Sequence, residues 1–125
     1  YPDEISKYSD FKIPEQLAQK WPGALTVIVP LKFPFSEKNA TVAFRCPGDL
    51  WLRNVIAECG FPIYSTSVNR SGSPVLDSVR GIEKEFANEV DLIIDDGDKK
   101  GSLPSTIVLL ENGGWKVLRQ GSVIV

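Results

Sequence analysis

The sequence of 125 residues contains no histidine and no methionine, and it has only two cysteines. Without histidine the chain cannot supply a Ser-His-Asp triad, a Cys-His dyad, or a His-ligated zinc or haem site. Cys46 and Cys59 lack CxxC spacing, so we expect reduced, partly buried thiols in a cytoplasmic protein. Because the chain begins at Tyr1 and not at a methionine, we expect it to be part of a longer gene product.

The chain also lacks long apolar runs and an excess of positive charge. No run approaches the roughly 18–20 apolar residues of a membrane span, and no signal peptide opens the sequence, so we expect no membrane contact. With 14 basic and 16 acidic side chains the net charge is −2, which argues against a broad nucleic-acid surface. Residues 95–98 are rich in aspartate but lack calcium-loop spacing, which favours a solvated acidic turn and no metal site.

Apolar patterns typical of strands alternate with patterns typical of helices. They predict strands at 25–31, 41–45, 62–67, 90–95, 105–110 and 115–119, with a short edge at 122–125. They predict helices at 14–21, between Asp49 and Gly60, and at 77–88. Asn112-Gly113-Gly114 predicts a hairpin turn between the last two strands. This order predicts an α/β fold with a mixed-direction sheet and flanking helices.

Small polar side chains gather after the predicted strand 62–67. Alternation along that strand would place Ser65, Ser67 and Asn69 on one face. Ligands of open α/β sheets bind outside the carboxyl ends of strands, and three uncharged hydrogen-bonding groups suit phosphate or ribose oxygens. A Ser/Asn-rich turn that merely caps a strand is the alternative, and from the chemistry alone it is the more common one.

Two arginines end predicted strands, Arg45 after an apolar strand and Arg119 after the last one. Surface ion pairing is the common explanation for such arginines. The functional alternative is a bidentate clamp on a carboxylate or phosphate, which the planar guanidinium fits better than lysine does. Ser105, at the start of the predicted hairpin, adds a hydroxyl at the same sheet edge. Together these residues indicate an anionic ligand at one end of the sheet.

Five motifs span residues 21–121, nearly the whole chain. They are Trp21-Pro22-Gly23-x-Leu25-Thr26, Val42-Ala43-Phe44-Arg45-x-Pro47, Ser65-Thr66-Ser67-x-Asn69-x-Ser71-Gly72, Pro104-Ser105-Thr106 and Leu118-Arg119-x-Gly121. In order and spacing this set resembles the YrdC-like domain family, which comprises the threonylcarbamoyl-AMP synthases. The resemblance implies a twisted, open α/β sheet with a concave site.

The resemblance also implies a reaction and a set of site residues. L-threonine, bicarbonate (or CO2) and ATP would give threonylcarbamoyl-AMP and pyrophosphate, and a partner enzyme would transfer the threonylcarbamoyl group to adenosine in tRNA. Mg²⁺ would accompany ATP, held mainly by phosphates, and no prosthetic group is implied. By motif, the threonine-binding residues would be Arg45, Ser65 and Ser105; the ATP-binding residues Thr41, Ser67 and Arg119; and the catalytic pair Ser67 and Asn69.

The sequence departs from the family pattern at three places. Pro22-Gly23-Ala24 stands where the family has Pro-Gly-Pro, and Val75 where many members have serine. Residues 1–20 contain no Lys-x-Arg, the motif that supplies half of the family's catalytic tetrad. We therefore expect residues 1–125 to be the C-terminal two-thirds of a YrdC-like domain, with doubtful activity on their own. A non-catalytic module that binds nucleotide, or RNA weakly, is the alternative.

Overall fold

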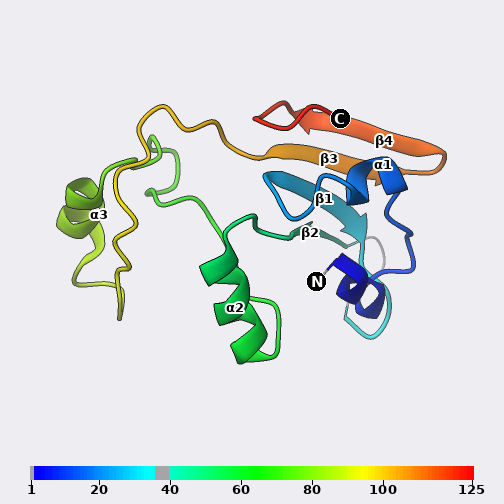
Figure 1. Ribbon diagram of the computed structural model, residues 1–125, viewed down its shortest axis with the longest axis horizontal. Coiled ribbons are helices and arrows are strands. Elements are labelled where there is room, and N and C mark those ends of the chain that lie inside the picture. Colours follow the sequence, from blue (N-terminus) through cyan, green and yellow to red (C-terminus); the bar gives the residue numbers. More distant parts are fainter. Residues whose placement is uncertain (1, 36–39) are drawn as a thin grey trace. The chain divides into compact units, whose positions relative to one another are not determined.

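The computed structural model describes residues 2–35 and 40–125, and the chain divides into two units. Unit 1 comprises Tyr1–Pro62 and Leu103–Val125, and unit 2 comprises Ile63–Ser102. The elements of unit 1 are η1 (Pro2–Lys7), α1 (Glu15–Ala18), β1 (Leu25–Pro30), β2 (Thr41–Arg45), α2 (Leu50–Cys59), β3 (Thr106–Glu111) and β4 (Gly114–Arg119). Unit 2 contains α3 (Val79–Phe86) (Figure 1).

The strands of unit 1 form one sheet in the order β2-β1-β3-β4 (Figure 1). β1 pairs antiparallel with β2 and parallel with β3, and β3 pairs antiparallel with β4. Asn112 and Gly113 make the turn between β3 and β4, with Gly113 at a φ of +92°, a value that favours glycine. The mixed sheet and its terminal hairpin confirm the predicted fold class.

One face of this sheet carries the hydrophobic core. Alternation along β1 buries Leu25, Val27 and Val29, and β3 adds Val108 and Leu110. Three side chains cover them: Ile5 of η1, Leu17 of α1, and Trp21, which lies three residues after α1. The opposite face, which we call the open face, carries half-buried side chains from the alternate positions, Thr26, Ile28, Ile107 and Leu109. The core therefore fixes the sheet from one side and leaves the other available for a site.

Local signals in the sequence correctly predicted the ends of α2. The Asp49 carboxylate accepts a hydrogen bond from the Leu52 amide at 2.6 Å, and Gly60 ends the helix with a φ of +73°. α1 and α3 are shorter than the predicted 14–21 and 77–88. Cys46 is half-buried as expected, whereas Cys59 is exposed, and both thiols are free.

Unit 2 corrects two predicted strands. Residues 62–67 and 90–95 are irregular, and most of their apolar side chains, such as Tyr64 and Leu92, are exposed. A strand needs a neighbouring strand for its backbone hydrogen bonds, and no other segment of unit 2 pairs with either run. The predicted edge strand 122–125 is also wrong, because the Val123 carbonyl accepts from side chains, Thr106 Oγ1 at 2.5 Å and Gln120 Nε2 at 2.9 Å.

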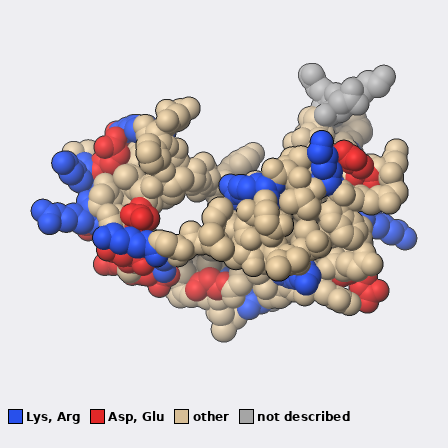
Figure 2. Space-filling view, turned by 90° about the horizontal axis from the view of Figure 1, so that it is seen from above, with Lys and Arg blue, Asp and Glu red and all other residues tan. Residues whose placement is uncertain are grey.

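The acidic loop of unit 2 is organised by its own hydrogen bonds. The Asp95 carboxylate accepts from the Gly97 amide at 2.8 Å, and Asp98 accepts from the Val79 amide at the start of α3 at 2.9 Å. Acidic and basic side chains intermingle over this unit (Figure 2).

Among residues 2–35 and 40–125, no group of His, Cys, Asp or Glu is arranged to hold a metal ion. The same described residues include no helix with the length and apolar character needed to cross a bilayer.

Candidate functional site

A row of paired residues crosses the open face at one end of the sheet. Arg45, the last residue of β2, lies opposite Thr26 near the start of β1. Thr26 pairs with Ile107 in β3, and Ile107 pairs with Arg119, the last residue of β4. Side chains of directly paired residues project from the same face, so both strand-ending arginines flank this end of the open face. Three strand spacings separate the two arginine Cα atoms by about 14 Å.

Ser105, the residue that precedes β3, bonds to two residues of this row, Thr26 and Arg119. Its hydroxyl lies 3.0 Å from Thr26 Oγ1. Arg119 donates from Nε and Nη2 to the Ser105 carbonyl at 3.0 and 2.8 Å, and from Nη2 to the Ser105 hydroxyl at 3.1 Å. We call Arg45, Thr26, Ser105 and Arg119 the sheet-end cluster. The prediction that Ser105 lies at the same sheet edge as the two arginines is confirmed.

The segment after β4 holds the Ser105 backbone in place. Thr106 is fully buried, and its hydroxyl accepts from the Gly121 amide at 2.9 Å. The Ser122 amide donates to the Pro104 carbonyl at 3.1 Å. An added Cβ at Gly121 would lie 2.1 Å from the Pro104 carbonyl oxygen, so only glycine allows this close approach. Thr106 and Gly121 thus support the cluster without belonging to it.

The Trp-Pro-Gly segment joins the strand ends on the other side of the cluster. The Gly23 amide donates to the Cys46 carbonyl, just after β2, at 2.9 Å. The Thr106 amide, at the start of β3, donates to the Ala24 carbonyl at 3.0 Å. Trp21 anchors the segment because its buried Nε1 donates to the Leu25 carbonyl at 2.7 Å. Four of the five sequence motifs therefore meet at this end of the sheet.

The charge of the cluster is positive. Within the described residues, neither Arg45 nor Arg119 forms an ion pair, so the interpretation as surface ion-pair partners finds no support there. Arg119 donates hydrogen bonds from Nε and Nη2 to Ser105, and these bonds fix the plane of its guanidinium. Its Nη1 has no partner among these residues. Two guanidinium groups with hydroxyls between them can bind carboxylate or phosphate oxygens.

Thr41 lies away from the sheet-end cluster. It begins β2 and pairs with Pro30, at the opposite end of the sheet from Arg45. The two residues share the open face because four strand positions separate them, which places their Cα atoms about 13 Å apart. A ligand that contacts both Thr41 and Arg119 would therefore have to extend across the open face.

Ser65, Ser67 and Asn69 belong to unit 2, in a loop and not on a strand. The predicted alternation therefore does not apply, and local hydrogen bonds set their arrangement instead. Ser67 Oγ donates to Asn69 Oδ1 at 2.5 Å. Asn69 Nδ2 donates to the carbonyls of Arg70 and Ser73, both at 3.0 Å. The Ser-x-Asn pair is thus a hydrogen-bonded unit within its own turn.

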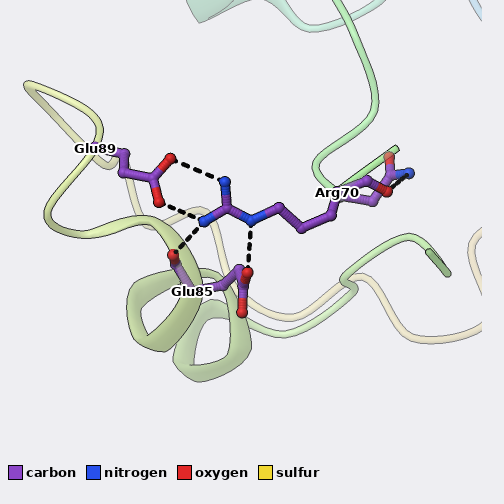
Figure 3. A network of polar contacts seen from close by, with 4 residues as sticks. Arg70, Glu85 and Glu89 are labelled. Atoms are coloured by element: carbon purple, nitrogen blue, oxygen red, sulfur yellow. Dashed lines mark hydrogen bonds and ion pairs between the residues drawn. The ribbon is translucent and has the colours of Figure 1, made fainter. Parts of the chain in front are cut away.

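Sequence reasoning missed Arg70, whose guanidinium contacts the C-terminal end of α3 (Figure 3). Its hydrogen bonds lower the pKa of the Glu89 carboxyl, and Glu89 and then Glu85 raise the pKa of Arg70. The one available signal was the spacing of Glu85 and Glu89, which places two carboxylates on one side of a helix end.

Comparison with known proteins decides the family. The model of the Sua5/YciO/YrdC family, described as "Telomere recombination", matches residues 2–121. The chain belongs to this family. The resemblance drawn from the five motifs is thereby confirmed.

Several relatives of this chain are named threonylcarbamoyl-AMP synthase, and other similar proteins have solved structures. The threonylcarbamoyl-AMP synthase of Pseudomonas entomophila is 32% identical over 111 residues, which cover 86% of this chain and 58% of that protein. The structure of P. abyssi Sua5 complexed with L-threonine superposes with a TM-score of 0.76 at 29% identity, covering 95% of this chain and 37% of that one. E. coli YciO superposes with a TM-score of 0.79 at 27% identity, covering 96% and 62%. The chain thus spans only part of each relative.

Proposed function

We propose that this chain is part of a threonylcarbamoyl-AMP synthase. The observation that carries the proposal is the sheet-end cluster in a chain of the Sua5/YciO/YrdC family. The cluster holds two hydroxyls and two arginines, neither of which forms an ion pair with another described residue. A related protein has been crystallised with L-threonine, whose carboxylate is the kind of anion that such a cluster can bind. The activity we propose is that of the whole protein, of which residues 1–125 form a part.

The reaction joins three substrates. The threonine amine takes up the carbon of bicarbonate with loss of water and becomes a carbamate. A carbamate oxygen then attacks the α-phosphorus of ATP, and pyrophosphate leaves, which gives threonylcarbamoyl-adenylate. Positive charge and hydrogen-bond donors that are already in position stabilise the charge that develops on the phosphoryl oxygens. Mg²⁺ would enter with ATP as part of the substrate.

Each predicted site residue has a role in this proposal. By the motif match, we assign Arg45 to the threonine carboxylate, and Ser65 and Ser105 to the same substrate. Arg119 and Thr41 contact the adenylate, and the separation of Arg45 from Arg119 along the row leaves room for a separate anion at each. Ser67 and Asn69 act at the reacting phosphate. A partner enzyme then transfers the threonylcarbamoyl group to tRNA.

The test is pyrophosphate release by the full-length protein. We expect release that requires L-threonine, bicarbonate and ATP together, with threonylcarbamoyl-adenylate as the second product by mass spectrometry. Ser67→Ala should weaken ATP binding more than threonine binding, while the control Lys20→Ala, at an exposed lysine, should leave both unchanged. No pyrophosphate release when all three substrates are present would overturn the proposal.

A protein that binds ATP but releases no pyrophosphate would instead be the non-catalytic nucleotide-binding module. An RNA-binding version of that module would show filter binding that falls steeply with salt, since phosphate contacts dominate such binding. The acid excess of the chain leads us to expect little of it. We also place the protein in the cytoplasm, which its two free thiols support.

A further inference from the structure

The loop that carries Ser67 and Asn69 has no buried side chain to hold it. Every residue of unit 2 is at least partly exposed, so hydrophobic burial does not fix this loop. Inside the loop, the Asn69 amide group and the Ser73 backbone amide both donate to the Arg70 carbonyl, at 3.0 and 2.9 Å. Two hydrogen bonds of the loop therefore end on the Arg70 carbonyl, and the Leu76 amide closes the loop by donating to the Val68 carbonyl at 2.9 Å.

The Arg70 side chain makes the only hydrogen bonds between residues 65–74 and the end of α3 (Figure 3). Its Nε donates to Glu85 Oε1 at 2.7 Å, and Nη2 donates to the Glu85 carbonyl at 3.4 Å. Nη1 donates to Glu89 Oε2 at 2.9 Å, and Nη2 pairs with the other oxygen of the same carboxylate. The guanidinium carbon also lies 4.6 Å from the centre of the Phe86 ring.

We propose that Arg70 is the positioning residue of the Ser-x-Asn pair: its guanidinium clamps the loop to the end of α3, and its carbonyl holds the Asn69 amide. The proposal rests on the proposed function, which makes Ser67 and Asn69 active at the phosphate. Arg70 itself acts through Asn69 and not on the substrate.

The chemistry of the clamp requires arginine. The planar guanidinium forms a two-bond fork with Glu89 and at the same time reaches Glu85, which a lysine ammonium cannot do. A cation at the C-terminal end of a helix is also favoured by the helix dipole, and the Phe86 ring adds a cation–π contact. The side chains involved are about half exposed, so the clamp acts through geometry more than through charge burial.

The direct test follows the Asn69 side-chain amide by NMR in ¹⁵N-labelled full-length protein. In the unaltered protein both Nδ2 protons are hydrogen-bonded, so we expect slow exchange with water. Arg70→Ala should speed this exchange and move both signals, and Glu89→Gln should do so less. Arg80→Ala, which removes an arginine of α3 that forms none of these contacts, should change neither signal. Unchanged Asn69 signals in Arg70→Ala would overturn the proposal.

Kinetics give the second test. If the protein releases pyrophosphate as proposed, Arg70→Ala should lower kcat about 10- to 100-fold, with a smaller change in KM for threonine, because misplacing a reacting group mainly affects the chemical step. In an Asn69→Ala background the same change should cost less than threefold, since the residue it positions is gone. Equal losses in both backgrounds would refute action through Asn69. If the unaltered protein released no pyrophosphate, the proposed function would be refuted, but the NMR test of the clamp would remain valid.

Discussion

Gly121→Ala tests whether the close approach of the segment after β4 sets the position of Ser105. The added methyl carbon would lie 2.1 Å from the Pro104 carbonyl oxygen, 2.5 Å from the Ser105 carbonyl carbon and 2.6 Å from the Thr106 nitrogen. All three atoms belong to the backbone, so no side chain can rotate away. The two segments would have to separate by about 1.4 Å at the Pro104 oxygen to reach an ordinary contact distance of roughly 3.5 Å.

That separation breaks specific contacts. Overpacking typically costs about 1–3 kcal/mol. The Gly121 amide would also move away from the hydroxyl of Thr106, which is fully buried, at a further cost of about 1 kcal/mol. We expect a total near 3 kcal/mol, which for an m-value near 1.5 kcal/mol/M lowers the urea midpoint by about 2 M. Because Ser105 orients Arg119, threonine and ATP affinity should fall as well.

The assay is urea unfolding of the full-length protein, followed by tryptophan fluorescence, since Trp21 lies in the core. Gly114→Ala is the matched control: it is the same substitution in β4, where an added Cβ meets nothing within 4 Å. We expect the control to stay within about 0.5 kcal/mol of the unaltered protein. If Gly121→Ala were as stable as Gly114→Ala, the close approach would not constrain the sheet end.

Three further predictions concern binding, the core and pH. Arg45→Ala should weaken threonine binding by on the order of 2–5 kcal/mol and ATP binding by less, as measured by calorimetry; equal losses would contradict its role. Trp21→Phe removes the donor to the Leu25 carbonyl and should destabilise the fold by about 1–3 kcal/mol in urea unfolding. Arg70 lowers the pKa of Glu89, so this pair stabilises the fold above the ordinary glutamate pKa of about 4.3 and loses its effect as the pH falls through the lowered value. The stability difference between the unaltered protein and Glu89→Gln should therefore shrink in acid, and a difference independent of pH would refute the pairing.

The sequence predicted those elements whose signals are local. α2 begins after Asp49 and ends at Gly60, as the sequence predicted. Side-chain capping and a left-handed C-terminal residue depend only on neighbours along the chain. β2 has the predicted bounds, and the hairpin turn at Asn112-Gly113 follows from the conformational freedom of glycine. Burial of alternate residues of β1 reflects the same local periodicity.

Residues 62–67 and 90–95 show where that logic fails. Both runs have the composition of strands, but composition describes only the side chains and not the hydrogen-bonding partner of the backbone. In unit 2 no other segment pairs with them, and most of their apolar side chains are exposed. Strand propensity alone therefore does not make a segment a strand. A helix forms its backbone hydrogen bonds within itself and can be predicted from its own residues.

The same distinction separates the candidate site residues that the sequence predicted from Arg70, which it missed. Arg45, Ser105 and Arg119 stand at strand ends, and strand pairing brings such ends together whatever the intervening sequence. Arg70 meets Glu85 and Glu89 at separations of 15 and 19 residues, without a strand to set the register. Its partners depend on where an irregular loop closes against a helix end, and no local pattern encodes that. A contact of this kind becomes visible only in the folded chain, yet its test is sharp because Arg80, in α3 of the same unit, lacks all of these partners.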